Sequence, residues 1–239
     1  MRGMRMAENP TTPTSRRAVL LAAGSAAVAA LATACGTDST ALRTTRQEAP
    51  ERAAPHPATA TPGCVLTTEW GAGPNYLDLD RVRSDITGGR EGVPFRLELT
   101  VVRASEGCRP VRGAAVDLWQ ADAQGAYSNA RDGYLRGTQL TDAAGRAVFR
   151  TIVPGWYAHL APHIHFKVRP DARTQTSSHF FFPEDLLQQL YARQPYARRT
   201  APKHPNGRDG RYRESGAALT LAPVADGAGY RAAYTVGIA

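Results

Sequence analysis

The sequence predicts an all-β domain: a β-sandwich of short, mostly antiparallel strands with one short surface helix. Apolar and polar residues alternate over short segments separated by Gly, Pro or Asp turns, and only one segment has a helical pattern. At 239 residues and 42% hydrophobic content, the chain can form one sizeable core with appendages. It is too short for two ordinary domains after a long leader. We therefore expect one domain, over residues 63–239.

The N-terminus, residues 1–35, has the features of a signal peptide. A charged start precedes an Ala-rich apolar run, and small residues stand before a cut site. The pair Arg16 and Arg17 indicates the twin-arginine export route. A membrane anchor is the alternative, but the apolar run over residues 18–34 is barely long enough to span a bilayer, so cleavage is favoured.

Two processing routes fit the end of this signal. Residues 32–34 suit ordinary cleavage before Cys35, which would release an extracellular protein. Residues 33–36 resemble a lipobox, which would attach a lipid to Cys35 and anchor the protein to the outer face of the cell membrane. We favour the lipid anchor. Residues 36–62 contain almost no large apolar side chain, so they are predicted to form a disordered linker.

The cysteines fit an exported protein. If Cys35 is lipidated or removed, Cys64 and Cys108 remain. Outside the cytoplasm such a pair is expected to form a disulfide that ties the N-terminal segment to the hairpin region, with two free buried thiols as the alternative.

The net charge of +8 suggests a solvated basic surface. Much of the surplus lies in residues 193–213, where Pro and Gly interrupt regular structure. No repeated aromatic platform accompanies it, so no nucleic-acid partner is expected. A loop facing anionic substrates or an anionic surface fits better.

The expected elements follow from the alternation. Strands are predicted over residues 94–102, 115–120, 146–152, 163–169, 179–182, 217–221 and 230–238. Residues 183–192 predict the helix, because Pro stands at its start and acidic residues in its first turn. Several short strands at this spacing are typical of a sandwich.

The densest chemistry lies in residues 154–168. His163 and His165 alternate with apolar residues, so on a strand both imidazoles leave one face and can reach one metal ion. Tyr157 lies six residues upstream of His163, across a turn that can return its phenol to the same place. The spacing alone is a weak signal, since a His-x-His pair on a strand is more often two ordinary polar residues.

The upstream sequence adds a recognisable order of motifs. A glycine turn precedes Tyr127, a Thr-Asp-x-x-Gly turn occupies residues 141–145, and Pro-Gly-x-Tyr ends at Tyr157 before the two histidines. This order resembles the core of the intradiol ring-cleavage dioxygenases, non-haem iron(III) enzymes that include catechol and protocatechuate dioxygenases, and especially their small exported bacterial relatives. The likeness runs from about Cys64 to the C-terminus, with its most specific part at residues 117–168.

The resemblance implies four iron ligands: Tyr127, Tyr157, His163 and His165. The chemistry is consistent, since Fe(III) prefers anionic oxygen, and two phenolates plus a hydroxide would balance its charge beside two neutral imidazoles. Tyr157 is implied to be the catalytic ligand, which leaves the iron when substrate binds and accepts a proton from the substrate. Without the tyrosines, the histidines would suit zinc or copper equally well.

The implied activity is cleavage of a catechol by dioxygen between its two hydroxylated carbons, giving a muconate-type diacid in the catabolism of aromatic compounds. Two alternatives remain open. One is a Cu or Zn metalloprotein that uses the same histidines. The other is a non-catalytic transthyretin-like sandwich that serves as a binding module.

Two positions depart from the family pattern and are predicted to line the substrate pocket. Leu160, with His159 beside it, stands where an arginine that stabilises the ring-derived anion is common. His179 stands where a glutamine is common, or is simply a polar residue at the pocket rim. Charge developing on the ring is then either met by another group, for which His159, Arg136 and Arg150 are the candidates, or left less stabilised.

Overall fold

The computed structural model describes residues 65–79, 81–157, 159–200 and 203–239. The predictions for the signal peptide, for the linker and for Cys35 and Cys64 fall outside these residues. Among the helices of the described part, none is long and apolar enough to cross a bilayer.

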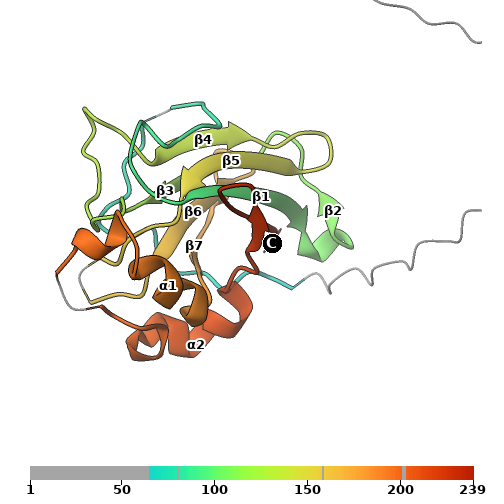
Figure 1. Ribbon diagram of the computed structural model, residues 1–239. Coiled ribbons are helices and arrows are strands. Elements are labelled where there is room, and N and C mark those ends of the chain that lie inside the picture. Colours follow the sequence, from blue (N-terminus) through green and yellow to red (C-terminus); the bar gives the residue numbers. More distant parts are fainter. Residues whose placement is uncertain (1–64, 80, 158, 201–202) are drawn as a thin grey trace, which may run out of the picture. The chain divides into compact units, whose positions relative to one another are not determined.

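The described part of the chain contains two β-sheets, as the alternation predicts (Figure 1). The first sheet has the order β2-β1-β9-β8, with β5 also pairing with β1. Its strands are β1 (Pro94–Arg103), β2 (Arg109–Pro110), β5 (Arg146–Ile152), β8 (Val224–Asp226) and β9 (Gly229–Ile238). The second sheet has the order β4-β3-β6-β7. Its strands are β4 (Arg136–Leu140), β3 (Ala115–Gln120), β6 (His163–Arg169) and β7 (Thr176–Phe181). Among these strands β1 and β9 pair in parallel and the other pairings are antiparallel.

Alternate residues of both sheets meet in one hydrophobic core. Leu97 and Leu99 of β1 belong to the same buried cluster as Ile164 and Phe166 of β6. Successive side chains of a strand point to opposite faces, so this burial directs the intervening residues of β6 to the outer face of the second sheet. His163 and His165 are two of those residues.

The predicted helix is confirmed as α1 (Glu184–Tyr191), with Pro183 at its N-cap position. Its two acidic residues lie in the first turn, where the helix dipole favours negative charge. Leu186, Leu187 and Leu190 add its buried side to the core.

A second helix, α2 (Gly210–Leu219), was not expected. The loop predicted over residues 193–213 ends earlier, because α2 begins at Gly210, and the predictions of a strand over 217–221 and of a single helix are wrong. Gly210 and Gly216 lower helix propensity, and beyond the cap at Asp209 the helix is stabilised by tertiary packing. Tyr212 and Leu219 pack against Phe181 of β7, with the Tyr212 and Phe181 rings 5.1 Å apart.

The remaining differences concern short elements. The predicted strand 179–182 is β7, which begins earlier, at Thr176, and ends at Phe181. β2, β4 and β8 were not predicted, because polar residues and Gly137 obscure the alternation. A Cβ at Gly137 would lie 2.6 Å from a methyl of Ile86, so the glycine is required by close packing. Three 3₁₀ turns complete the described elements: Ala104–Glu106, Tyr196–Arg198 and Asn206–Arg208.

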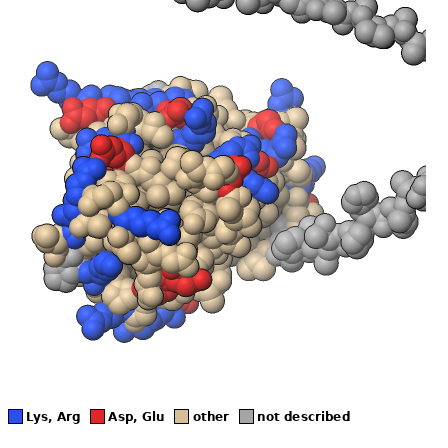
Figure 2. All heavy atoms as spheres, viewed as in Figure 1, with Lys and Arg blue, Asp and Glu red and all other residues tan. Residues whose placement is uncertain are grey.

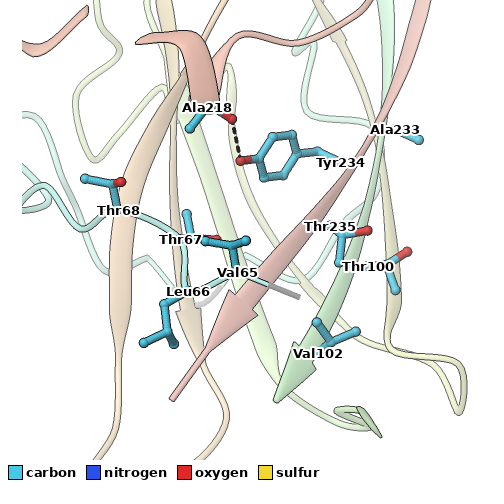
Figure 3. A pocket seen from close by; sticks show the side chains of 10 residues that line it. All are labelled: Val65, Leu66, Thr67, Thr68, Thr100, Val102, Ala218, Ala233, Tyr234 and Thr235. Atoms are coloured by element: carbon cyan, nitrogen blue, oxygen red, sulfur yellow. Dashed lines mark hydrogen bonds between the residues drawn. The ribbon is translucent and has the colours of Figure 1, made fainter. Parts of the chain in front are cut away.

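A cavity of about 510 Å³ lies between residues 65–68, β1, β9 and α2 (Figure 3). Threonines and small or aliphatic residues line it, together with Tyr234, whose hydroxyl donates to the Ala218 carbonyl at 2.7 Å. The polar side-chain groups of this lining are hydroxyls, which supply neither a metal ligand set nor an acid–base pair. The chemistry must therefore be sought elsewhere.

Candidate active site

His165 lies in a row of three rings across the second sheet. Trp119 of β3 and His179 of β7 are its register partners on either side. The Trp119 ring stacks on His165 at 4.9 Å with an interplanar angle of 1°, and the His179 ring is 5.7 Å away. Directly opposite residues share a face, so the strand pairing fixes the orientation of this imidazole.

His163 is oriented by a backbone carbonyl. Its Nδ1–H donates to the Ala161 oxygen at 2.6 Å, which leaves the lone pair on Nε2. That atom lies 2.9 Å from Nε2 of His165, and the two rings are perpendicular, at 89°. Two nitrogens bound to one ion at about 2.1 Å and at right angles lie roughly 3 Å apart. The pair therefore fits a single metal ion.

The two predicted tyrosines lie beside the histidines. The hydroxyl of Tyr127 is 3.4 Å from Nε2 of His163. The ring of Tyr157 meets that of Tyr127 edge-on, with centroids 5.0 Å apart. The structure thus brings together the four residues that the sequence motifs singled out.

Close packing of two loops holds the tyrosines there. Gly125 precedes Tyr127 and adopts φ +78°, and a Cβ on it would lie 2.2 Å from the carbonyl oxygen of Trp156, next to Tyr157. The carbonyl of Asp122 accepts the N–H groups of Gly125 and Gly155, at 2.9 and 3.0 Å. A larger residue at Gly125 would separate the loops and so the two phenols.

Arg136 braces the Tyr127 loop from within the fold. It is 4% exposed, and its three guanidinium nitrogens donate to Ser128 Oγ, Ser128 O and Asn75 O. Its Cζ is 5.8 Å from the centre of the Tyr127 ring. With its donors engaged in this way, Arg136 positions Tyr127 and is not directed at a substrate.

The protonation states fit a cation at this point. Burial lowers the pKa of His163, and it lowers the pKa of His165 well below its usual value, so both present lone pairs. Burial raises the pKa of Tyr127, which the nearby Arg136 partly offsets. A buried phenol of this kind ionises only if a cation binds beside it. No cluster of three or more His, Cys, Asp or Glu placed for a metal occurs in the described residues. Tyr127 and Tyr157 are the oxygen donors that lie beside the two imidazoles.

The residues predicted to line the substrate pocket or to act on the substrate differ in burial and in their neighbours. His159 is exposed, with its ring 6.4 Å from that of His204. Leu160 is half-buried, and its N–H donates to the Tyr157 carbonyl at 3.1 Å. His179 is 1% exposed and 5.3 Å from His163, so it lies inside the cluster and not at an exposed rim. Arg150 is exposed on β5, in the other sheet.

Sequence reasoning missed three neighbours of the site: Trp70, Trp119 and Arg211. Trp119 could have been found, because the alternation of β3 places it on the face opposite the core. Trp70 lies in an irregular segment, its ring 6.1 Å from His179. Arg211 lies in the first turn of α2, which was not predicted from the sequence.

The metal-free protein should lose stability in mild acid because of His179. Burial, with His163 and Arg211 nearby, lowers the pKa of His179 to about 3. The unfolded chain takes up this proton near pH 6.5, whereas the folded chain does not, so the free energy of unfolding falls as pH drops below 6.5. The loss from this residue between pH 6.5 and 5 should be about 2 kcal/mol.

Urea unfolding of metal-free protein at several pH values tests this. His179→Gln should flatten the pH dependence by that amount, while His159→Gln, at an exposed site, should leave it unchanged. An identical slope in wild type and His179→Gln would contradict the prediction.

Comparison with known proteins gives consistent matches. A family model described as "Dioxygenase" matches residues 71–198, which include the four clustered residues. The protocatechuate 3,4-dioxygenase beta chain of Burkholderia cepacia is 33% identical over 128 residues, 46% of this chain and 54% of that protein. The chain thus spans about half the length of this relative.

Two solved structures share the fold. An intradiol ring-cleavage dioxygenase from Tetranychus urticae aligns with a TM-score of 0.69 and 28% identity, over 73% of this chain and 94% of its own. The dioxygenase domain of a dioxygenase carbohydrate-binding protein fusion from Streptomyces sp. SirexAA-E aligns with a TM-score of 0.55 and 26% identity, over 73% and 98%.

Proposed function

The chain belongs to the intradiol ring-cleavage dioxygenase family, and on this premise we propose that it is an exported non-haem Fe(III) enzyme that cleaves catechol-type rings between the two hydroxylated carbons. One observation carries the proposal. The Nε2 atoms of His163 and His165 converge to 2.9 Å, with the hydroxyl of Tyr127 3.4 Å from the first of them.

The residues that would hold iron are Tyr127, Tyr157, His163 and His165. Ferric iron, when bound, supplies the site that takes both catechol oxygens and makes the ring reactive toward dioxygen. The chain keeps His163 in the required tautomer through the Ala161 carbonyl, and the Trp119 stack keeps His165 from rotating.

Tyr157 is suited to move the substrate proton. Tyr157 is half-buried, whereas the two histidines are 4% exposed, so Tyr157 is more accessible than they are to an entering catechol. In the proposed reaction Tyr157 Oη, a phenolate once a cation is bound, takes a proton from a catechol hydroxyl and holds it as a neutral phenol while the ring is opened. Tyr127, braced by Arg136, keeps its place.

The aromatic surroundings favour a flat apolar ring. Trp119 covers His165, and Trp70 lies against His179. Such walls exclude water from the reacting ring and strengthen the electrostatic interactions within the site. A catechol fits this setting better than an aliphatic diol does.

The alternatives remain less well supported. Zinc or copper would account for the histidines and leave the placement of Tyr127 and Tyr157 without purpose, since phenolate oxygen favours hard ferric iron. A non-catalytic binding module would have no need for the buried arginine that holds Tyr127.

We extend the proposal to the location of the protein. Export by the twin-arginine route, an anchor or cleavage at Cys35, and a disulfide between Cys64 and Cys108 rest on the sequence motifs. Catechols from environmental aromatics would then be met outside the cytoplasm.

The test is the reaction product. Iron-loaded protein given catechol in air should consume oxygen in equimolar amount and release cis,cis-muconate, identified by mass and ultraviolet spectrum. Metal-free protein is the control. A quinone product would support copper oxidase chemistry, a semialdehyde would mean cleavage outside the hydroxylated carbons, and an absence of oxygen uptake on a catechol panel would favour the binding module.

A further inference from the structure

The start of α2 is tied to the candidate site through Asp209. Its Oδ2 accepts the N–H of Ala161, and its Oδ1 accepts the N–H of Arg211, each at 2.8 Å. The Ala161 carbonyl in turn receives the Nδ1–H of His163. The first turn of α2 is thus fixed relative to the histidines by two short links.

The side chain of Arg211 lies on the side of Trp70 and His179. Its Cζ is 5.8 Å from the centre of the Trp70 ring. Trp70 donates its Nε1–H to Ser215 Oγ at 2.8 Å, one turn along the same helix, and its ring is 6.1 Å from that of His179. The positive charge of Arg211 also contributes to lowering the pKa of His163, His165 and His179. Arg211 therefore contributes a positive charge to the site.

This charge lacks an acidic partner in the described part of the chain. No hydrogen bond or ion pair of the Arg211 guanidinium occurs among the described residues. The nearest carboxylate by sequence, Asp209, is engaged by backbone N–H groups. By contrast, Arg198 pairs with Glu91 at 2.6 Å. Arg211 is half-buried, and a half-buried cation of this kind is stabilised by an incoming anion.

The surrounding charge has the same sign. Residues 193–213 contain seven Lys or Arg and one acidic residue, Asp209. Figure 2 shows Lys and Arg side chains distributed over the visible face with fewer acidic ones between them. Such a surface raises the local concentration of anions.

We propose that Arg211 is a specificity-determining residue that binds a carboxylate on the ring of the substrate, so that the preferred substrates are catechols with an acidic ring substituent. The proposal rests on the ring-cleavage function and names its substrate class. A planar guanidinium can bind a carboxylate through two parallel hydrogen bonds. The Arg211 guanidinium lies over Trp70, whose ring is 6.1 Å from that of His179, so a carboxylate bound there would belong to a ring held at the histidine cluster.

The first test measures binding without turnover. The probes are 4-hydroxybenzoate and its neutral analogue 4-hydroxybenzyl alcohol, titrated calorimetrically into the iron-loaded protein. Arg211→Gln should lower the affinity for 4-hydroxybenzoate about tenfold to a hundredfold and change the affinity for the neutral probe by no more than about twofold. Arg213→Gln makes the same change of charge at an exposed position two residues along the helix. It should leave the affinities for both probes within about twofold of the wild-type values. Arg211→Lys, which keeps the charge without the planar fork, should restore part of the lost affinity.

The second test measures discrimination. The ratio of kcat/KM for 3,4-dihydroxybenzoate to that for catechol should fall by a similar factor in Arg211→Gln, mainly through KM. Equal losses on both substrates would overturn the inference, because Arg211 would then act on the ring chemistry or the fold. Unchanged values would overturn it as well. If the protein cleaves both catechols and Arg211→Gln leaves the ratio of their kcat/KM values unchanged, only this inference is contradicted. If the protein cleaves no catechol, the proposed function is contradicted.

Discussion

Replacing His163 with alanine is expected to remove most of the bound iron and, with it, the ring-cleavage activity. The imidazole supplies one of two nitrogens that converge to 2.9 Å, and because its Nδ1–H donates to the Ala161 carbonyl, Nε2 carries the lone pair that can bind a metal. Loss of a partner that only orients a ligand typically costs ten- to a hundredfold in metal affinity, so loss of the ligand should cost at least about a hundredfold.

The measurement is iron per chain after dialysis, together with kcat. His159→Ala, an exposed histidine four residues earlier in the same segment, is the matched control and should keep both. Circular dichroism should show that His163→Ala remains folded. A folded His163→Ala protein that retains the wild-type iron content would contradict the assignment of this ligand.

Tyr157→Phe is expected to keep iron and lose turnover, with kcat falling by about a hundredfold to ten-thousandfold. Its hydroxyl is proposed to accept the substrate proton, and its half-buried ring meets that of Tyr127 edge-on. Tyr127→Phe should behave differently and lose most of the metal, because the Tyr127 hydroxyl lies 3.4 Å from Nε2 of His163.

The two variants should therefore differ in iron content. The measurements are metal analysis and kcat on catechol for each variant. A Tyr157→Phe enzyme as active as the wild type would contradict the proton-transfer role. Equal loss of iron in both variants would show that the two tyrosines do not have the different roles proposed here.

Local patterns were sufficient to predict the strand that carries the histidines. The alternation over residues 163–169 placed Ile164 and Phe166 in the core and directed both imidazoles to the opposite face, and the structure shows that arrangement. This succeeded because the period of a strand is a local property that burial of one face enforces.

The approach of the two tyrosines could not be derived from spacing. It depends on Gly125 and on Asp122, which hold two loops against each other across about thirty residues of sequence. A local pattern carries no information about such a contact, so Tyr127 was identified by resemblance to a family.

The helix α2 shows where sequence reasoning fails for physical reasons. Its propensity is weakened by two glycines, and although Asp209 caps its start locally, its packing on Phe181 is a tertiary contact. Missing the helix also meant missing Arg211. The sequence offered Arg136 and His159 as substitutes for a charge at Leu160, but the first is committed to the Tyr127 loop and the second is exposed.

The iron content and visible spectrum of the purified protein test the central claim most directly. Two phenolates on ferric iron absorb visible light by charge transfer, so the account predicts a red-brown protein with about one iron per chain. The colour should weaken in Tyr157→Phe and be nearly absent in Tyr127→Phe. A colourless protein that carries stoichiometric zinc would contradict the account.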